Sequence, residues 1–228
     1  MTRRRMKKEY SMTALLSSTY FGPVQWYQKL NRYGTAMIER HENFVKQTYR
    51  NRCIIAAANG AQALTVPVER PEGTPLSKSL IKDIRISDHG NWRHIHWNAL
   101  KSAYGESPFF EYYADDLLPF FTRRWTFLYD FNMEICRIMC SLLDIEPDIR
   151  HTDGYIPPVK DSTDGSPAIH SNGTDDYRYA ICPKHPMHDE TFSPKPYYQV
   201  YAAKTGFLPN MSILDLLFNM GNESVLYL

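Results

Sequence analysis

The chain has 228 residues, of which 43% are hydrophobic and 22% are charged, and this composition is ordinary for a globular protein. Its formal net charge of +1 excludes a strong overall field that would draw the protein to nucleic acid or to a membrane surface. No apolar run approaches the roughly 20 residues of a membrane span, and the apolar stretch 13–16 is too short for a signal-peptide core. The four cysteines do not resemble a disulfide framework, so we expect a cytoplasmic protein.

The domain organisation is predicted to be simple. The first residues carry a basic run, Arg3 to Lys8, and residues 1–12 are predicted to form a disordered basic tail. The remaining residues, 13–228, are enough to bury a full core, and we expect them to form a single domain.

The N-terminal part predicts strands, one helix and a hairpin. Strands at 14–20 and 35–40 flank a helix that begins after Gly22-Pro23, because proline suits the first helical turn. Asn59-Gly60 stands between two β-rich runs and predicts a hairpin turn. Alternation of polar and apolar residues predicts a further strand at 82–86.

The middle and the end of the chain predict helices. One is expected to run to Tyr104 with Asn91 or Asp88 as its cap, and Ser107-Pro108 opens a second. A longer helix is predicted over 125–142 by apolar residues at helical spacing. After a candidate strand at 197–202, Ser212 and Asp215 open the last helix in a pattern like a capping box.

The stretch 152–194 differs in composition from the rest of the chain. It is rich in proline and contains Asp-Gly, Asn-Gly and serine clusters, which are typical of turns and loops. The predicted fold class is therefore α+β, with a mixed or antiparallel sheet, helices packed against it, and a long loop excursion near residues 152–194.

Segments spread along the chain together resemble a known family. The first is 41–52, with His-Glu-Asn-Phe followed later by an Asn-Arg pair; the second, 96–110, opens with His-Trp; the third is the Asp-Phe-Asn of 130–132. The fourth, 197–219, ends with Pro-Asn-Met-Ser-Ile-Leu-Asp-Leu-Leu-Phe-Asn. In this order, from Ala14 to the C-terminus, they resemble the WbqC-like protein family. The excursion is not part of that pattern, and neither is Cys53, which argues against a catalytic thiol there.

The resemblance implies a role in the biosynthesis of surface polysaccharides such as O-antigen. It suggests a transferase that moves an acyl or aminoacyl group from a carrier-protein thioester to an amino sugar. The implied partners are a nucleotide-linked amino sugar and an acyl carrier protein. The alternative is a non-catalytic binding or scaffold protein in a polysaccharide-assembly complex, because family membership alone does not determine function.

His41 and His96 are the candidate catalytic residues. An amine loses a proton as it attacks a thioester, and imidazole can accept that proton near neutral pH. The alternative for each is a hydrogen-bonded structural histidine. The residues expected to contact substrate are Asn43, Lys46, Arg50, Asn51, Arg52, Tyr104, Gln199, Asn210 and Asp215.

The basic residues of 46–55 are the candidate phosphate ligands. If this segment is extended, Lys46, Thr48, Arg50 and Arg52 share one face, and guanidinium groups match phosphate geometry. A solvated strand face is the alternative. For Asp215, the alternative to a substrate contact is the cap of the last helix.

We expect no metal and no cofactor. A zinc site is the alternative, at the compactly spaced Cys182, His185 and His188. Zinc needs a fourth ligand or a water there. His94 and His96 would share a face only in a strand, whereas this segment is predicted to be helical.

Overall fold

The computed structural model describes residues 12–158, 168–169 and 173–228, so the predicted tail lies outside the described residues except for Met12. The strands are β1 (Thr13–Ser17), β2 (Thr35–Glu39), β3 (Arg52–Ala57), β4 (Gly60–Thr65), β5 (Ile149–His151), β6 (Ala168–Ile169) and β7 (Thr174–Asp176). The α-helices are α1 (Val24–Arg32), α2 (Trp92–Tyr104), α3 (Phe110–Leu117), α4 (Pro119–Thr122), α5 (Leu128–Leu142), α6 (Ala202–Thr205) and α7 (Ile213–Met220). Short 3₁₀ helices are η1 (Leu76–Lys78), η2 (Ile81–Asp83), η3 (His89–Asn91) and η4 (Gly221–Tyr227).

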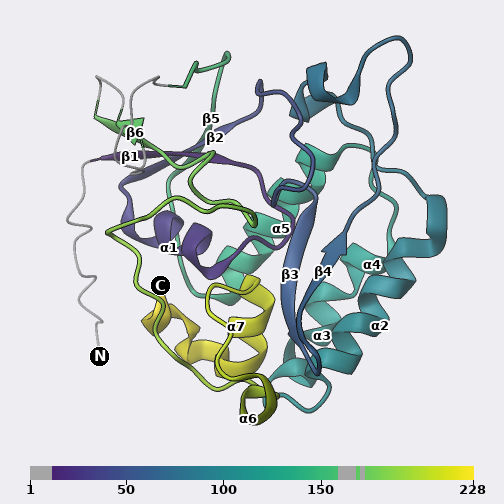
Figure 1. Ribbon diagram of the computed structural model, residues 1–228, viewed down its shortest axis with the longest axis vertical. Coiled ribbons are helices and arrows are strands. Elements are labelled where there is room, and N and C mark those ends of the chain that lie inside the picture. Colours follow the sequence, from purple (N-terminus) through teal and green to yellow (C-terminus); the bar gives the residue numbers. More distant parts are fainter. Residues whose placement is uncertain (1–11, 159–167, 170–172) are drawn as a thin grey trace.

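The main sheet is mixed, as predicted, and has the order β5-β2-β1-β7-β6. β1 pairs in parallel with β2 and with β7, β2 pairs in parallel with β5, and within the described part of this sheet only the β6–β7 pairing is antiparallel. Ala14, Leu15 and Leu16 of β1 are fully buried, which suits the central strand of a parallel sheet that is covered on both faces. In Figure 1 the sheet crosses the upper part of the molecule, with α1 and α7 below it.

The predicted hairpin is confirmed as the antiparallel pair β3–β4, but its two turn residues are Ala58 and Asn59 and not the predicted Asn59-Gly60, because Gly60 already pairs with Ala57 as the first residue of β4. Gly60 has a φ of +105°, which glycine adopts without steric cost. β3 contacts both α2 and α7, so the hairpin lies between the two helices (Figure 1). Its backbone is joined to the start of α7 by a hydrogen bond of 2.7 Å from Ser212 N–H to the Ile54 carbonyl.

The helices predicted from apolar spacing are present, but two of the predicted N-caps are wrong. α3 begins at Phe110 with Phe109 at its N-cap, because the Ser107 hydroxyl donates to the Tyr104 carbonyl instead. Asn91 precedes α2 but makes no side-chain capping hydrogen bond. α1 follows Pro23 directly, and Pro119 opens α4. Along α5, Phe131, Ile135 and Met139 are fully buried at helical spacing. None of the helices in the described part of the chain is long and apolar enough to cross a membrane.

Two predicted strands are wrong. Residues 82–86 begin within η2, and only Arg85 and Ile86 make isolated bridges, to Phe127 and to Val68. Residues 197–202 pair with no strand among the described residues. There the Gln199 side chain bonds the backbone of Leu208 instead, and α6 follows at once.

The predicted excursion is largely irregular where it is described, yet it also supplies part of the sheet. β7 pairs with the central strand through Leu15 and Asp176, and all three residues of β7 are buried. The chain segment that looks most loop-like in sequence therefore places polar side chains beside β1.

Candidate functional site

The carboxyl ends of β1, β2, β5 and β7 lie along one edge of the sheet, because these strands are parallel. The chain moves from β1 through α1 to β2 on one side, and β7 adds to β1 on the other side. The ends of β1 and β7 are therefore the place where the strand order reverses. Ligands of open α/β sheets bind in the crevice at such a point.

Two arginines are buried at this edge and both are paired with carboxylates. Arg178, just after β7, donates to Asp176 at 2.9 Å and to Glu39 at 3.2 Å. Arg50 donates to Glu42 at 2.8 Å and to the Ser17 hydroxyl at 2.8 Å. Each guanidinium thus joins segments that are distant in sequence, and both already have anionic partners inside the protein.

Glu39 is the centre of this charged network. Its fully buried carboxylate accepts from the His41 N–H at 2.8 Å, the Thr152 hydroxyl at 2.7 Å, the Ile156 N–H at 3.0 Å and Arg178. The cavity between Ser17, Arg50 and Arg178 measures about 10 Å³, which is room for about one water. A larger ligand at this edge has to bind at its rim.

The rim carries half-exposed titratable groups. The Arg40 Nε–H is shared between the Thr152 carbonyl at 3.1 Å and His41 Nε2 at 3.3 Å. Beside them, His151 Nδ1 lies 2.7 Å from the Tyr129 hydroxyl. Burial, and then the positive charge of Arg40, lower the pKa of His151, so this imidazole is neutral at neutral pH.

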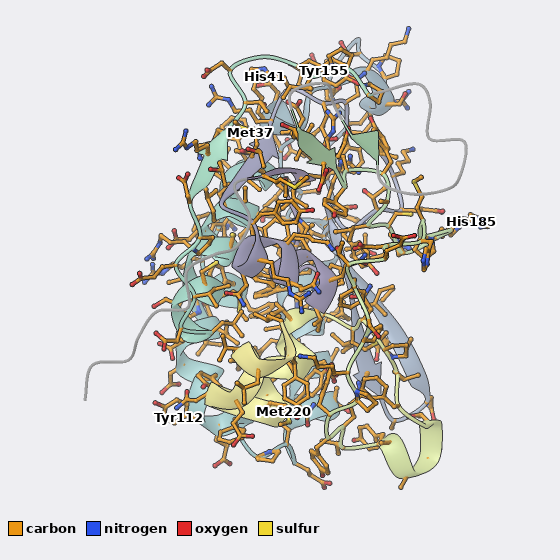
Figure 2. The ribbon with its side chains drawn as sticks, turned by 90° about the vertical axis from the view of Figure 1, so that its left-hand side faces the viewer. Met37, His41, Tyr112, Tyr155, His185 and Met220 are labelled. Carbon is orange, nitrogen blue, oxygen red and sulfur yellow. The ribbon has the colours of Figure 1, made fainter. Side chains whose placement is uncertain are left out.

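Two exposed tyrosines lie beside the same arginine. Tyr155 and Tyr179 are 48% and 43% exposed. Their ring centroids lie 5.8 and 5.7 Å from the Arg178 guanidinium carbon. Figure 2 shows Tyr155 and His41 at the same end of the molecule. Exposed aromatic rings beside polar groups offer flat apolar area to a ligand.

His96 is not at this edge. It lies on α2, buried, with Nδ1 at 2.9 Å from the Tyr20 hydroxyl and a second hydrogen bond to the Thr65 backbone. Burial lowers the pKa of His96 to about 4, so its ring is neutral. The structure therefore does not bring the two predicted catalytic histidines together. His94 is exposed on the same helix, which confirms that the two rings point apart.

Three of the predicted contact residues do meet, in a buried cluster around Asp215. Its carboxylate accepts from the Tyr197 hydroxyl at 2.6 Å and from Gln199 Nε2 at 2.7 Å, and it is also hydrogen-bonded to Tyr104. Burial raises the pKa of Asp215 to about 6, although these hydrogen bonds oppose the shift. Ser212 caps α7 as predicted, through Leu214 N–H, but the Asp215 side chain faces this cluster and is not the other half of a capping box.

The proposed common face of Lys46, Thr48, Arg50 and Arg52 is wrong, because the strand begins only at Arg52 and Gln47 has a φ of +61°. Lys46 is exposed, whereas Arg50 is buried. The other predicted contacts are dispersed: Asn43 is exposed, Asn51 donates to the Val66 carbonyl, Arg52 to the Thr65 hydroxyl, and Asn210 bonds Gln25.

No group of three or more metal-binding side chains occurs in the part of the chain that the structure describes. The Cys182 thiol donates to the Lys184 carbonyl at 2.7 Å. His170, a possible fourth zinc ligand, lies outside the described residues. Burial raises the pKa of the Cys53 thiol well above its usual range, so this cysteine is not a nucleophile in this conformation.

The model of the WbqC-like protein family matches residues 18–227. The chain belongs to this family. The resemblance inferred from the ordered motifs is thereby confirmed. An uncharacterized protein of Mycobacterium tuberculosis (strain ATCC 25618 / H37Rv), Rv1507c, is 28% identical over 204 residues, which are 81% of this chain and 83% of that protein. No solved structure matches this WbqC-like chain.

Sequence patterns did not point to several residues of the edge. Glu39 and His151 are the last residues of β2 and β5. Because ligands bind at the carboxyl ends of parallel strands, their positions alone could have identified them as site residues. Arg178 could not be identified in this way, because it follows the Thr-Asp-Asp of β7, and aspartate has a low strand propensity. Tyr155 and Tyr179 were hidden by the loop-like composition around them.

Proposed function

We propose that this WbqC-like protein is a cytoplasmic transferase of surface-polysaccharide biosynthesis. It moves an acyl or aminoacyl group from a carrier-protein thioester to the amine of a nucleotide-linked amino sugar. Family membership supports the biosynthetic context. The observation that carries the proposal is the rim group of His41, Arg40 and His151 at the ends of parallel strands, beside exposed tyrosines.

In the proposed reaction the amine nitrogen attacks the thioester carbonyl. A C–N bond forms, the C–S bond breaks, the amine loses a proton and the carrier thiolate takes one up. His41 is the base in this scheme, because it is the predicted catalytic histidine that is partly exposed. The Arg40 Nε–H is shared between two acceptors, and its contact to His41 Nε2 is the longer of the two, at 3.3 Å. A substrate amine can replace this contact.

The sugar is proposed to lie against Tyr155 and Tyr179, within reach of this base. Arg40 is the proposed partner of the substrate diphosphate, because it is partly exposed and pairs with no carboxylate among the described residues. Arg50 and Arg178 instead hold the strand ends in place through their carboxylate partners.

A binding or scaffold protein is the second candidate. It is favoured by the saturation of both buried arginines and by the separate burial of His96. Such a protein would use the exposed tyrosines for recognition without chemistry.

Transfer assays with an acyl-loaded carrier protein and a nucleotide-linked amino sugar, read by mass spectrometry, separate these candidates. We expect His41→Ala to lower kcat/KM by about 100-fold, because a positioned base contributes at least that much. His89→Ala is the control, since His89 is exposed on η3, which contacts α2 and supplies no residue of the rim. Unchanged transfer by His41→Ala and His151→Ala would refute the catalytic proposal. Binding of the sugar nucleotide that depends on Tyr155, without any transfer, would support the scaffold.

A further inference from the structure

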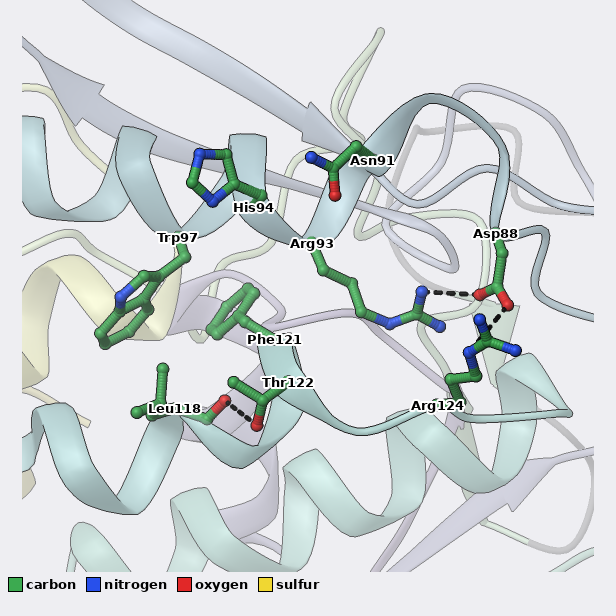
Figure 3. Close-up of a pocket in the computed structure, with 9 residues that line it drawn as sticks. All are labelled: Asp88, Asn91, Arg93, His94, Trp97, Leu118, Phe121, Thr122 and Arg124. Carbon is green, nitrogen blue, oxygen red and sulfur yellow. Dashed lines mark hydrogen bonds and ion pairs between the residues drawn. The ribbon is translucent and has the colours of Figure 1, made fainter.

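A second hollow lies away from the sheet edge, between the start of α2 and α4. Its volume is about 350 Å³, within the range of small-molecule pockets. None of the strand-end residues described above lines it. Figure 3 shows its side chains, with aromatic rings at one end and two arginines at the other.

The charged end is built around Asp88. Arg93 Nη1 lies 2.6 Å and Arg124 Nε lies 3.4 Å from its two carboxylate oxygens. One carboxylate thus faces two guanidinium groups, so this end of the hollow has a net positive charge. The Asp88 carboxylate would repel an anion, but it also holds both arginines in place.

The two arginines differ in freedom. Arg93 is only 13% exposed, and its guanidinium carbon lies 4.6 Å from the centroid of the Trp92 ring. Its Nε and Nη2 are buried and have no hydrogen-bond partner among the described residues, so a phosphate has to approach this side chain at Nη1. Arg124 is 85% exposed, and within the described part of the chain its ion pair is the 3.4 Å contact to Asp88. A largely buried guanidinium beside an exposed one offers an anionic group two cationic partners.

The apolar end is formed by Trp97, Phe121 and Leu118. The Trp97 ring is half-buried, and its centroid lies 5.4 Å from that of Phe121 and 5.8 Å from that of Phe110. These rings hold the indole in position. A flat ligand group can therefore pack against the indole without the entropic cost of ordering that side chain.

We infer that this hollow is a nucleotide-binding site, with the phosphates on Arg93 and Arg124 and the base against Trp97. Cationic groups at one end and a supported indole at the other match the two halves of a nucleotide. The polar side chains between them, Asn91, His94 and Thr122, lie where a ribose would pass. The site is separate from the proposed acceptor site and goes beyond the transferase reaction.

Isothermal titration of the full chain with uridine 5′-diphosphate, adenosine 5′-diphosphate and inorganic pyrophosphate tests this inference. Both nucleotides should bind more tightly than pyrophosphate, because only they reach Trp97. Arg124→Ala should weaken nucleotide binding by about tenfold, since one charge-assisted contact is lost. Arg123→Ala removes the neighbouring exposed charge, which does not line the hollow, and should change affinity by less than about twofold. Trp97→Phe should reduce nucleotide affinity and leave pyrophosphate affinity unchanged.

Equal losses in Arg123→Ala and Arg124→Ala would overturn the inference, because they would mean attraction by general surface charge. So would nucleotide binding that survives Arg124→Ala unchanged, or the absence of saturable binding at about 1 mM nucleotide. Repeating the titrations with Arg40→Ala, which removes the proposed diphosphate partner at the sheet edge, separates the two proposals. Nucleotide binding in the α2–α4 hollow should be unchanged in that variant.

Discussion

Replacement of Asp215 by asparagine should change how the stability of the protein depends on pH. The Asp215 carboxyl is fully buried under Tyr197 and Gln199, and its pKa is raised from 3.8 to about 6 by burial. Asparagine keeps an oxygen that accepts hydrogen bonds from Tyr197 and Gln199, but its amide does not titrate in this pH range. The difference between the wild type and Asp215→Asn therefore isolates the titration of this one group.

The sign follows from the direction of the shift. A raised pKa means that the folded state holds the proton more tightly than the unfolded state does. The stabilisation is complete below pH 3.8 and is lost as the pH rises through about 6. A shift of about two pKa units corresponds to about 3 kcal/mol. The wild type should therefore lose about 3 kcal/mol relative to Asp215→Asn over this window.

Urea unfolding followed by tryptophan fluorescence, from pH 3.5 to pH 7, measures the free energy of unfolding of both proteins. Asp115→Asn is the matched control, because Asp115 is exposed on α3, and its difference from the wild type should stay flat. A difference between the wild type and Asp215→Asn that is constant within about 0.5 kcal/mol would refute the reasoning. A rise with pH would refute it as well.

Arg178→Met should lower the free energy of unfolding by about 3–5 kcal/mol, because it leaves Asp176 and Glu39 buried without their cationic partner. The exposed pair of Arg150 provides the comparison, and denaturant unfolding of Arg150→Met should show a loss below about 1 kcal/mol. His96→Gln should remove a loss of stability that occurs as the pH falls, whereas the Asp215 carboxyl causes a loss as the pH rises. The lowered pKa of His96 makes its contribution complete above pH 6.5 and lost toward pH 4, an effect of about 3 kcal/mol in the same unfolding assay.

Local signals in the sequence predicted much of the secondary structure. The β3–β4 hairpin, the helix after Pro23 and the capping of α7 by Ser212 depend on residues within a few positions of each other. The apolar spacing of α5 likewise needs no distant partner. These features were predictable because turn, cap and amphipathic patterns act over one or two turns of chain.

The candidate site was less predictable, because its residues depend on strands that are distant in sequence. His41 was found from a motif, but its neighbour His151 follows it by more than a hundred residues and joins it only through the β2–β5 pairing. Arg178 reaches the edge because β7 pairs with β1. No local pattern contains these pairings.

The sequence by itself therefore determined the family, the mixed helix–strand composition and the individual elements formed by near neighbours. Only the tertiary structure decided that a polar Thr-Asp-Asp segment lies beside the central strand and that Asp215 faces a buried cluster. The physical reason is that a buried polar group needs partners, and here those partners come from other elements. Glu39, held by donors from several segments, exists as a buried carboxylate only once the whole sheet edge is assembled.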